Sequence, residues 1–178
     1  MTLLFSAEQN FDRKILHEYY NVCVKMDNKQ GFMEVIKMRL DGLGLFVDHM
    51  PTMVRFYRDV LGFEIIEGEH AVNVYLIKDG TLFMLYERKN FEKMTSRKYE
   101  YLKGLNGHFE IALYVDTFEE VDKEYARIIA QGGQSVLEPT TEPWGQHTCY
   151  IADPEGNLIE IGSFNRSFDN RTNFNEIQ

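Results

Sequence analysis

Two glutamates and a group of aromatic residues are the side chains in this sequence best suited to binding a small molecule. Glu110 and Glu160 lie on the first and last predicted strands of the second half of the sequence. Carboxylates of this kind can neutralise the charge of a cationic ligand. Phe46, Tyr86 and Tyr114 could stack against a flat or cationic ligand. Apolar walls with a few placed polar groups are the usual make-up of a small-molecule site. The alternative is that both glutamates are solvated on an exposed sheet face.

An internal repeat would position these residues. Residues 43–48, LGLFVD, match residues 111–116, IALYVD, at an offset of 111 − 43 = 68 residues. Each copy predicts an apolar strand, an acidic turn, a helix that ends at a glycine, and three further strands. Asp48 and Asp116 sit where a carboxylate could cap the following helix or favour its positive end. The two middle strands are expected at 63–67 and 72–78 in the first copy, and at 135–138 and 147–152 in the second.

Alternation along the strands predicts which residues share the face that points away from the helices, called here the inner face. Trp144 and one side of the strand at 147–152 would complete the wall of this face. Either His147 or Thr148 points inward, since both choices leave a tolerable apolar opposite face. The candidate ligand-binding residues are Phe46, Met84, Tyr86, Glu110, Tyr114, Trp144, His147 and Glu160.

Two stretches of the sequence resemble the vicinal oxygen chelate superfamily of glyoxalases, bleomycin-resistance proteins and extradiol dioxygenases. They are the helix end VRFYRDVLGF at 54–63 and the close of the second copy, with PWG at 143–145 and DPEGNLIEI at 153–161. The resemblance implies an α+β fold in which tandem βαβββ modules form a curved mixed β-sheet half-barrel, with helices on the outer face. The expected domain spans 38–164, with module one at 38–87, a linker helix or loop at 88–106, and module two at 107–164. An amphipathic N-terminal arm at 1–37 and a C-terminal tail at 165–178 flank this domain.

The resemblance also shows where metal-dependent relatives would place their ligands. Those positions fall on Gly42, Met84, Glu110 and Glu160, and only Glu160 keeps the expected residue type. We therefore expect a small-molecule-binding protein without a metal cofactor, for an aromatic or cationic ligand. The alternative is a metal-dependent lyase, isomerase or dioxygenase-like enzyme with a divalent metal ion held by Glu110 and Glu160, which would then be the catalytic residues.

Composition narrows the class of protein further. The 178 residues carry 19 Lys and Arg against 28 Asp and Glu, a net charge of −9, which argues against nucleic acid as a partner. No apolar run is long enough to span a membrane. Two cysteines, Cys23 and Cys149, lie far apart and indicate a cytoplasmic protein with reduced thiols. A homodimer is the expectation that follows from the resemblance. The arm at 1–37 would pack on its own domain or on a second subunit, or else be a leader that adds little, since Met38 would serve as a natural domain start. A third possible function is an interaction module whose arm docks on a partner.

Overall fold

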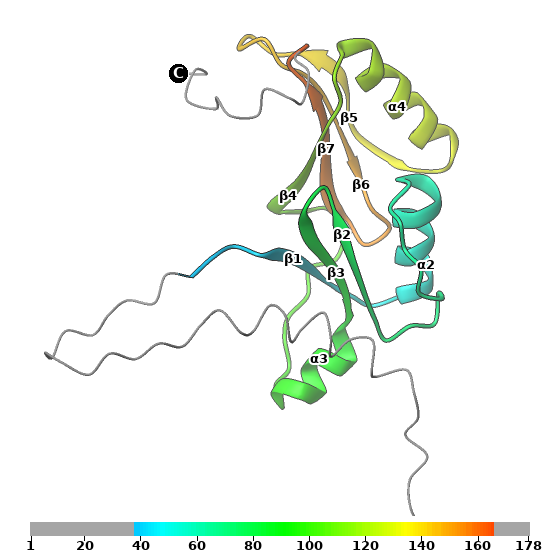
Figure 1. Cartoon of the computed structure of the whole chain (residues 1–178), viewed down its shortest axis with the longest axis vertical. Coiled ribbons are helices and arrows are strands. Elements are labelled where there is room, and N and C mark those ends of the chain that lie inside the picture. The colour runs from blue at the N-terminus through cyan, green and yellow to red at the C-terminus, as the bar shows by residue number, and fades with distance from the viewer. Residues whose placement is uncertain (1–37, 166–178) are drawn as a thin grey trace, which may run out of the picture. The chain divides into compact units, whose positions relative to one another are not determined.

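The computed structural model of the chain describes residues 38–165, which form two mixed β-sheets flanked by helices (Figure 1). The first sheet has the order β1-β3-β2, and its strands are β1 (Gly42–Val47), β2 (Asn73–Lys78) and β3 (Thr81–Glu87). The second has the order β4-β7-β6-β5, with β4 (Asn106–Tyr114), β5 (Gln134–Thr141), β6 (His147–Ala152) and β7 (Asn157–Ser163). These sheets correspond to the two predicted modules.

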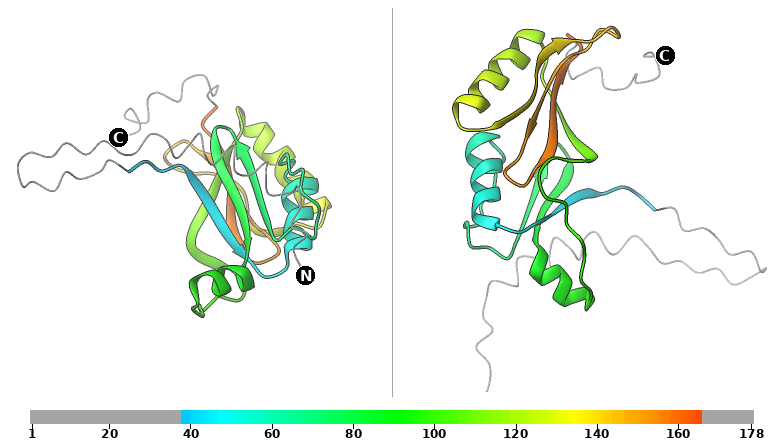
Figure 2. Two further views of the ribbon diagram at one scale, coloured as in Figure 1. Left: turned by 60° about the horizontal axis from the view of Figure 1, so that its bottom comes forward. Right: turned by 180° about the vertical axis from the view of Figure 1, so that it is seen from behind.

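Two of the helices lie on the same side of the sheets, one beyond the other (Figures 1 and 2). In module one α2 (Met50–Arg55) continues as a π-helical turn, η1 (Phe56–Val60), and in module two the equivalent helix is α4 (Phe118–Ala130). A third helix, α3 (Arg88–Thr95), begins the linker and contacts β1 and β3. Among residues 38–165, no helix is long and apolar enough to cross a membrane.

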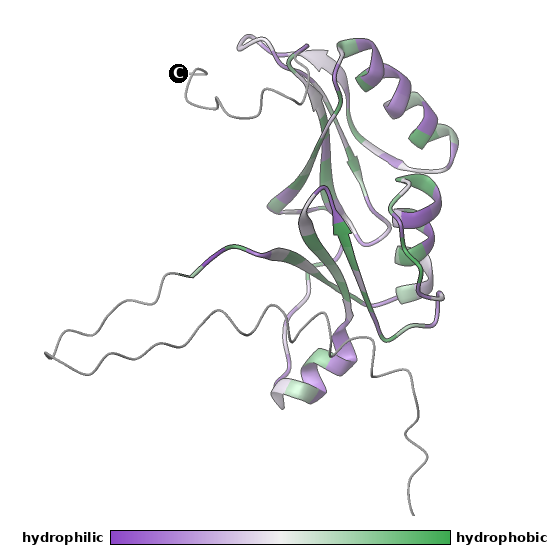
Figure 3. Cartoon of the chain, viewed as in Figure 1, coloured by the Kyte–Doolittle hydropathy of each residue, from purple (hydrophilic) through white to green (hydrophobic). Residues whose placement is uncertain are grey.

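Strand pairing confirms the duplicated α+β fold. The first and last strands of each module pair in parallel, β1 with β3 and β4 with β7, and the neighbouring hairpin strands pair antiparallel. The alternation predicted from the sequence agrees with burial, because the helix-side residues form the core. These core residues include Leu45, Val47, Phe83 and Leu85 in module one, and Ile111, Ile159 and Ile161 in module two. Figure 3 shows hydrophilic and hydrophobic residues alternating along α4, as its position at the surface requires.

The predicted strand at 63–67 is wrong, although its residues keep a two-residue alternation of burial. Phe63 and Ile65 are buried, but the segment joins neither sheet. The carboxylate of Glu67 accepts a hydrogen bond of 3.1 Å from the backbone N–H of Tyr75 on β2. A further strand would need this backbone N–H at the edge of β2 as a hydrogen-bond donor. Because the N–H already donates to the Glu67 side chain, the sheet ends at β2.

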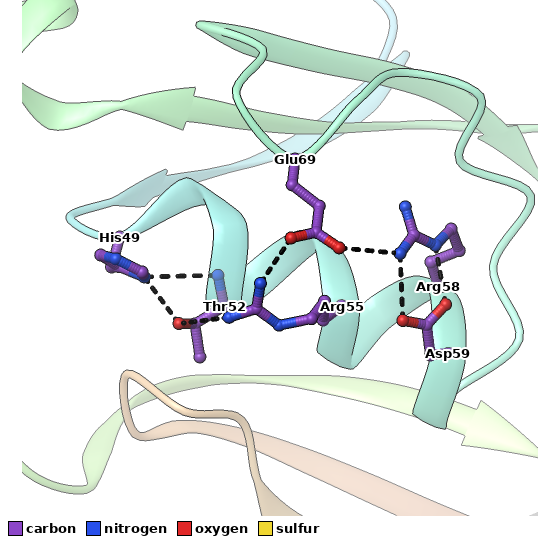
Figure 4. A network of polar contacts seen from close by, with 6 residues as sticks. All are labelled: His49, Thr52, Arg55, Arg58, Asp59 and Glu69. Atoms are coloured by element: carbon purple, nitrogen blue, oxygen red, sulfur yellow. Dashed lines mark hydrogen bonds and ion pairs between the residues drawn. The ribbon is translucent and has the colours of Figure 1, made fainter.

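Ion pairs hold the rest of this segment against the helix. Glu69 accepts from Arg55 and also from Arg58, at 3.2 Å, while Arg58 pairs with Asp59 at 2.7 Å (Figure 4). The two arginines lie on successive turns, three residues apart, so one carboxylate can reach both. The connection from η1 to β2 is thus fixed by side chains rather than by strand pairing.

The helix caps lie one residue later than predicted. His49 caps α2, its Nδ1 accepting from the Thr52 N–H at 3.3 Å. Thr117 caps α4 in a capping box, in which its hydroxyl accepts from the Glu120 N–H and the Glu120 carboxylate accepts from the Thr117 N–H. Asp48 and Asp116 precede these caps and cap neither helix, while their other expected role, a favourable charge near the positive end of the helix, stays a prediction.

The turn between β6 and β7, residues 153–156, joins the two modules. The buried Asp153 accepts from the Tyr57 hydroxyl of η1 at 3.0 Å. Glu155 accepts from the backbone N–H groups of Asp48 and His49, at 2.8 and 2.9 Å, and pairs with Arg88 at 2.7 Å. One acidic turn of module two thus binds the start of α2 and the linker.

Two of the predicted segments cannot be compared with the structure. The amphipathic arm at 1–37 lies outside the described residues, as does all of the tail at 165–178 except its first residue, Asn165. In the expected linker at 88–106, α3 lies at the start, and Asn106 at the end already begins β4.

Candidate functional site

The inner face of module two is built on three adjacent strands. Register pairs Glu160 of β7 with Ala112 of β4 on one side and with Tyr150 of β6 on the other. Two pairs further along, Tyr114 lies opposite Gly162. Because paired residues in a sheet share a face, these side chains all point away from α4.

Glu160 is a buried carboxylate, with 5% of its surface exposed. Its Oε1 accepts from the Gln146 amide at 2.8 Å and from the Thr148 hydroxyl at 2.9 Å. The Gln146 amide also donates to the Tyr114 hydroxyl at 3.1 Å, and its carbonyl oxygen accepts from the Trp144 indole N–H at 3.0 Å. A buried charge is costly without such donors, so this network holds Glu160 in one orientation.

Glu110 is the exposed counterpart, and its partner is Tyr150, which lies beside Glu160 in the strand register. The Tyr150 hydroxyl donates to Glu110 Oε2 at 2.8 Å. Burial raises the pKa of Tyr150, and its hydrogen bond to Glu110 and the charge of Glu160 raise this pKa further. Burial, followed by the charge of Glu160, raises the pKa of Tyr114 to about 12. Both phenols therefore remain protonated hydrogen-bond donors at neutral pH beside the two carboxylates.

The inner face of module one is aromatic. The Tyr86 ring lies 6.1 Å from the ring of Phe46 and 5.6 Å from that of Tyr75, between centroids. Gly44 lies beneath these groups, and a Cβ there would be 3.4 Å from both the Met84 methyl carbon and the Tyr86 ring. A glycine at this position lets the side chains of β3 lie across β1.

The placement of the predicted site residues largely follows the alternation. Phe46, Met84, Tyr86, Glu110, Tyr114 and Glu160 all lie on inner faces, and Trp144 joins Glu160 through Gln146. His147 points to the opposite face, towards the helix. Its Nε2 contacts Asp122 of α4 at 3.0 Å, and its Nδ1 contacts Thr141 at 2.8 Å. Thr148 takes the inward position. The ligand-binding roles of these residues stay predictions.

Sequence reasoning missed Gln146 and Tyr150. Gln146 follows the turn at 143–145, where no alternation indicates a side-chain direction. Tyr150 lies on the same face of its strand as Thr148, so an inward Thr148 would have indicated an inward Tyr150. The strand at 147–152 has apolar residues on both faces, however, and the sequence does not show which face points inward.

The residues at the expected metal-ligand positions do not fit a divalent ion. Gly42 has no donor, and the Met84 thioether is a soft sulfur that accepts from the Tyr86 hydroxyl at 3.4 Å. Glu160 and Glu110 remain as oxygen donors. Between residues 38 and 165, no group of three or more His, Cys, Asp or Glu side chains gathers as a metal site would require.

Fold and site together define a protein with two related modules, βαββ with an aromatic inner face and βαβββ with an acidic one. The sequence model of the Glyoxalase/Bleomycin resistance protein/Dioxygenase superfamily matches residues 39–161. The chain belongs to this superfamily, which confirms the resemblance seen in the sequence.

Similar proteins support the same assignment. The chain is 27% identical over 151 residues to a protein described as virulence protein STM3117 of Salmonella typhimurium, covering 82% of this chain and 98% of the relative. A Burkholderia phytofirmans glyoxalase/bleomycin resistance protein/dioxygenase family enzyme has a similar structure, with a TM-score of 0.62, 24% identity, and 71% and 99% of the two chains covered. A lactoylglutathione lyase from Agrobacterium tumefaciens gives a TM-score of 0.57 at 23% identity, covering 72% and 95%. At these identities the two structural likenesses show the fold alone.

Proposed function

We propose that the chain is a small-molecule-binding protein of the glyoxalase/bleomycin-resistance type that holds a flat or cationic organic ligand on its inner face without a metal ion. The observation that carries this proposal is the presence of two carboxylates on one face of the sheet, with Tyr150 donating to Glu110 and pairing in register with the buried Glu160. A ligand cation at this place would meet two negative charges and phenol oxygens.

Electrostatics and the aromatic rings favour the same class of ligand. Glu110 makes no ion pair with any residue from 38 to 165, so its charge is available to a cation. Rings of the kind provided by Phe46 and Tyr86 attract a cation by about 0.5–2 kcal/mol, according to how far it is desolvated. The net charge of −9 adds a long-range attraction.

Titration calorimetry with a panel of cationic aromatic compounds tests this function. Wild-type protein is compared with Glu110→Gln, which keeps the shape of the side chain and removes its charge. We expect the substitution to weaken binding about tenfold or more, because a charge-assisted contact is lost. The matched control is Glu119→Gln, an exposed glutamate on α4, which should leave affinity unchanged. Equal affinities of wild type and Glu110→Gln would refute the role of the carboxylate.

The alternative function is a metal-dependent lyase, isomerase or dioxygenase-like enzyme acting on a vicinal-oxygen substrate. The retained carboxylate at Glu160 favours it, whereas Gly42 and Met84 speak against it. Stoichiometric metal in purified protein, absent from Glu160→Ala, would decide for this alternative.

For the assembly and compartment, we propose a cytoplasmic homodimer. Met94, Leu102 and Leu105 in the linker region are exposed apolar side chains, which a second copy would remove from water. The buried free thiol of Cys149 suits a reducing compartment. Sedimentation of the full chain as a monomer over the micromolar range would argue against the dimer.

A further inference from the structure

A crevice of about 480 Å³ lies between the modules, along the open edge of β4. Its lining includes every residue from Glu110 to Val115, and consecutive residues of a strand point to opposite faces. The crevice therefore reaches from the inner face, at Glu110 and Tyr114, around the strand edge to the helix side. Its volume is within the range of small-molecule sites.

Most of the helix-side wall of the crevice is apolar, and the ion pair of Glu124 and Arg127 on α4 lies beside the apolar residues. Leu43 and Phe83 line it from module one, and Ile111 and Ile128 line it from module two. Phe83, Ile111 and Ile128 are buried core residues, so their positions are held by packing rather than by a ligand. A hydrocarbon group that entered here would lie against preformed walls and leave water.

All the charged side chains that line the crevice form ion pairs with one another, except Glu110. Lys78 pairs with Asp79 at 2.8 Å, and Arg127 pairs with Glu124 at 2.7 Å. Glu110 is the remaining charged residue of the lining, and the hydrogen bond that it receives comes from the neutral Tyr150. An occupant of matching chemistry has an apolar body and one cationic end.

We propose that this crevice binds the apolar tail of the ligand, so that the ligand class is an elongated amphiphilic cation such as an alkylammonium compound. Its cationic end lies at Glu110, and its tail passes the edge of β4 towards Phe83 and Ile128. This inference rests on the proposed function and adds the shape and polarity of the ligand to it.

The test is calorimetric titration with alkyltrimethylammonium ions of increasing chain length, from tetramethylammonium to octyltrimethylammonium. In wild-type protein the affinity should rise about fourfold for each methylene that enters the crevice. Alkanols of the same chain lengths are titrated in parallel. If they bind as tightly as the ammonium ions, the cationic end at Glu110 is refuted.

A substitution that fills the crevice separates this inference from the proposed function. Thr81 is exposed and lines the crevice, so Thr81→Trp should keep the affinity for tetramethylammonium and abolish the gain with chain length. The control is Ile66→Trp, at a side chain of the same module that is 90% exposed and outside the lining. It should behave as wild type.

The outcomes are distinct. An equal gain with chain length in Thr81→Trp and wild type overturns the role of the crevice, while the proposed binding of cations at Glu110 stands. If no ammonium ion of any length binds the wild-type protein, the proposed function fails and this inference fails with it.

Discussion

Glu160 shows how a buried charge can be kept in a protein of this size. Two donors, from Gln146 and Thr148, meet the same carboxylate oxygen, and both come from the hairpin that pairs with β7. Because Thr148 is fixed by the sheet register and Gln146 by its bonds to Trp144 and Tyr114, the carboxylate is oriented before any ligand arrives. Such preorganisation lowers the cost of binding.

The donor from Thr148 can be removed without changing the shape of the side chain. In Thr148→Val the buried Glu160 loses one hydrogen bond, so we expect the free energy of unfolding to fall by about 1.5–3 kcal/mol. Urea denaturation at neutral pH measures this change. Thr140→Val is the control on the partner strand, since Thr140 pairs with Thr148 in the register. If both variants lose the same stability, Thr148 does not support Glu160 specifically.

Single residues also show why part of the site was open to sequence reasoning and part was not. Glu110, Tyr114 and Glu160 lie on strands whose opposite face is strongly apolar, so their direction could be predicted from alternation. On β6 the opposite face contains His147 and Cys149, and the direction of the strand could not be settled. His147 meets Asp122 of α4, a contact 25 residues apart that no local pattern indicates.

At the scale of the elements, the repeat predicts the strands and helices of both modules but not how the modules differ. The periodicity of apolar residues predicts a helix and strands at equivalent positions of the two copies. The parallel pairing of β1 with β3 and of β4 with β7 is implied by the resemblance to the family fold. The segment at 63–67 departs from its counterpart β5 because Glu67 takes a backbone donor of β2. That contact depends on tertiary structure, which local propensity does not describe.

The two helices contain corresponding tyrosines with different tasks. Tyr57 is fully buried, and its hydroxyl donates to Asp153 of the other module. Its counterpart Tyr125 makes a bond of 2.7 Å with Ser135 inside module two. The repeat thus uses the same residue type for contact between modules in one copy and within a module in the other.

This difference predicts unequal effects of the same substitution. Tyr57→Phe should lower the free energy of unfolding by about 1.5–3 kcal/mol, because the buried carboxylate of Asp153 loses a donor. Tyr125→Phe removes a more exposed neutral bond and should cost about 0.5–1.5 kcal/mol. Urea denaturation of the two variants compares them directly. If Tyr125→Phe lowered the free energy of unfolding as much as Tyr57→Phe or more, the hydrogen bond between Tyr57 and Asp153 would not be the stronger contact that we assign to the module interface.

At the scale of the whole molecule, four buried or half-buried tyrosine and cysteine side chains are held neutral in an acidic protein. Burial raises the pKa of Cys149 and of Tyr114 to about 12 each, and burial together with Asp153 raises that of Tyr57 well above 10. Tyr150 shifts in the same direction. All four groups are therefore easier to deprotonate in the unfolded chain than in the folded one.

Stability should consequently fall in alkaline solution. Below about pH 8.5, the ordinary pKa of a thiol, both states keep these protons and the stabilisation is complete. From there through about pH 10 and upward, the unfolded chain releases protons that the folded protein keeps, so the free energy of unfolding decreases with pH. The contribution of Tyr114 and Cys149 to this decrease ends once they ionise in the folded state, near pH 12. Urea denaturation between pH 8 and 11 measures the decline, and Tyr114→Phe should make it shallower above pH 10, because phenylalanine has no proton to lose. A free energy of unfolding that stays level up to pH 11 would show that these side chains are not held neutral by the fold.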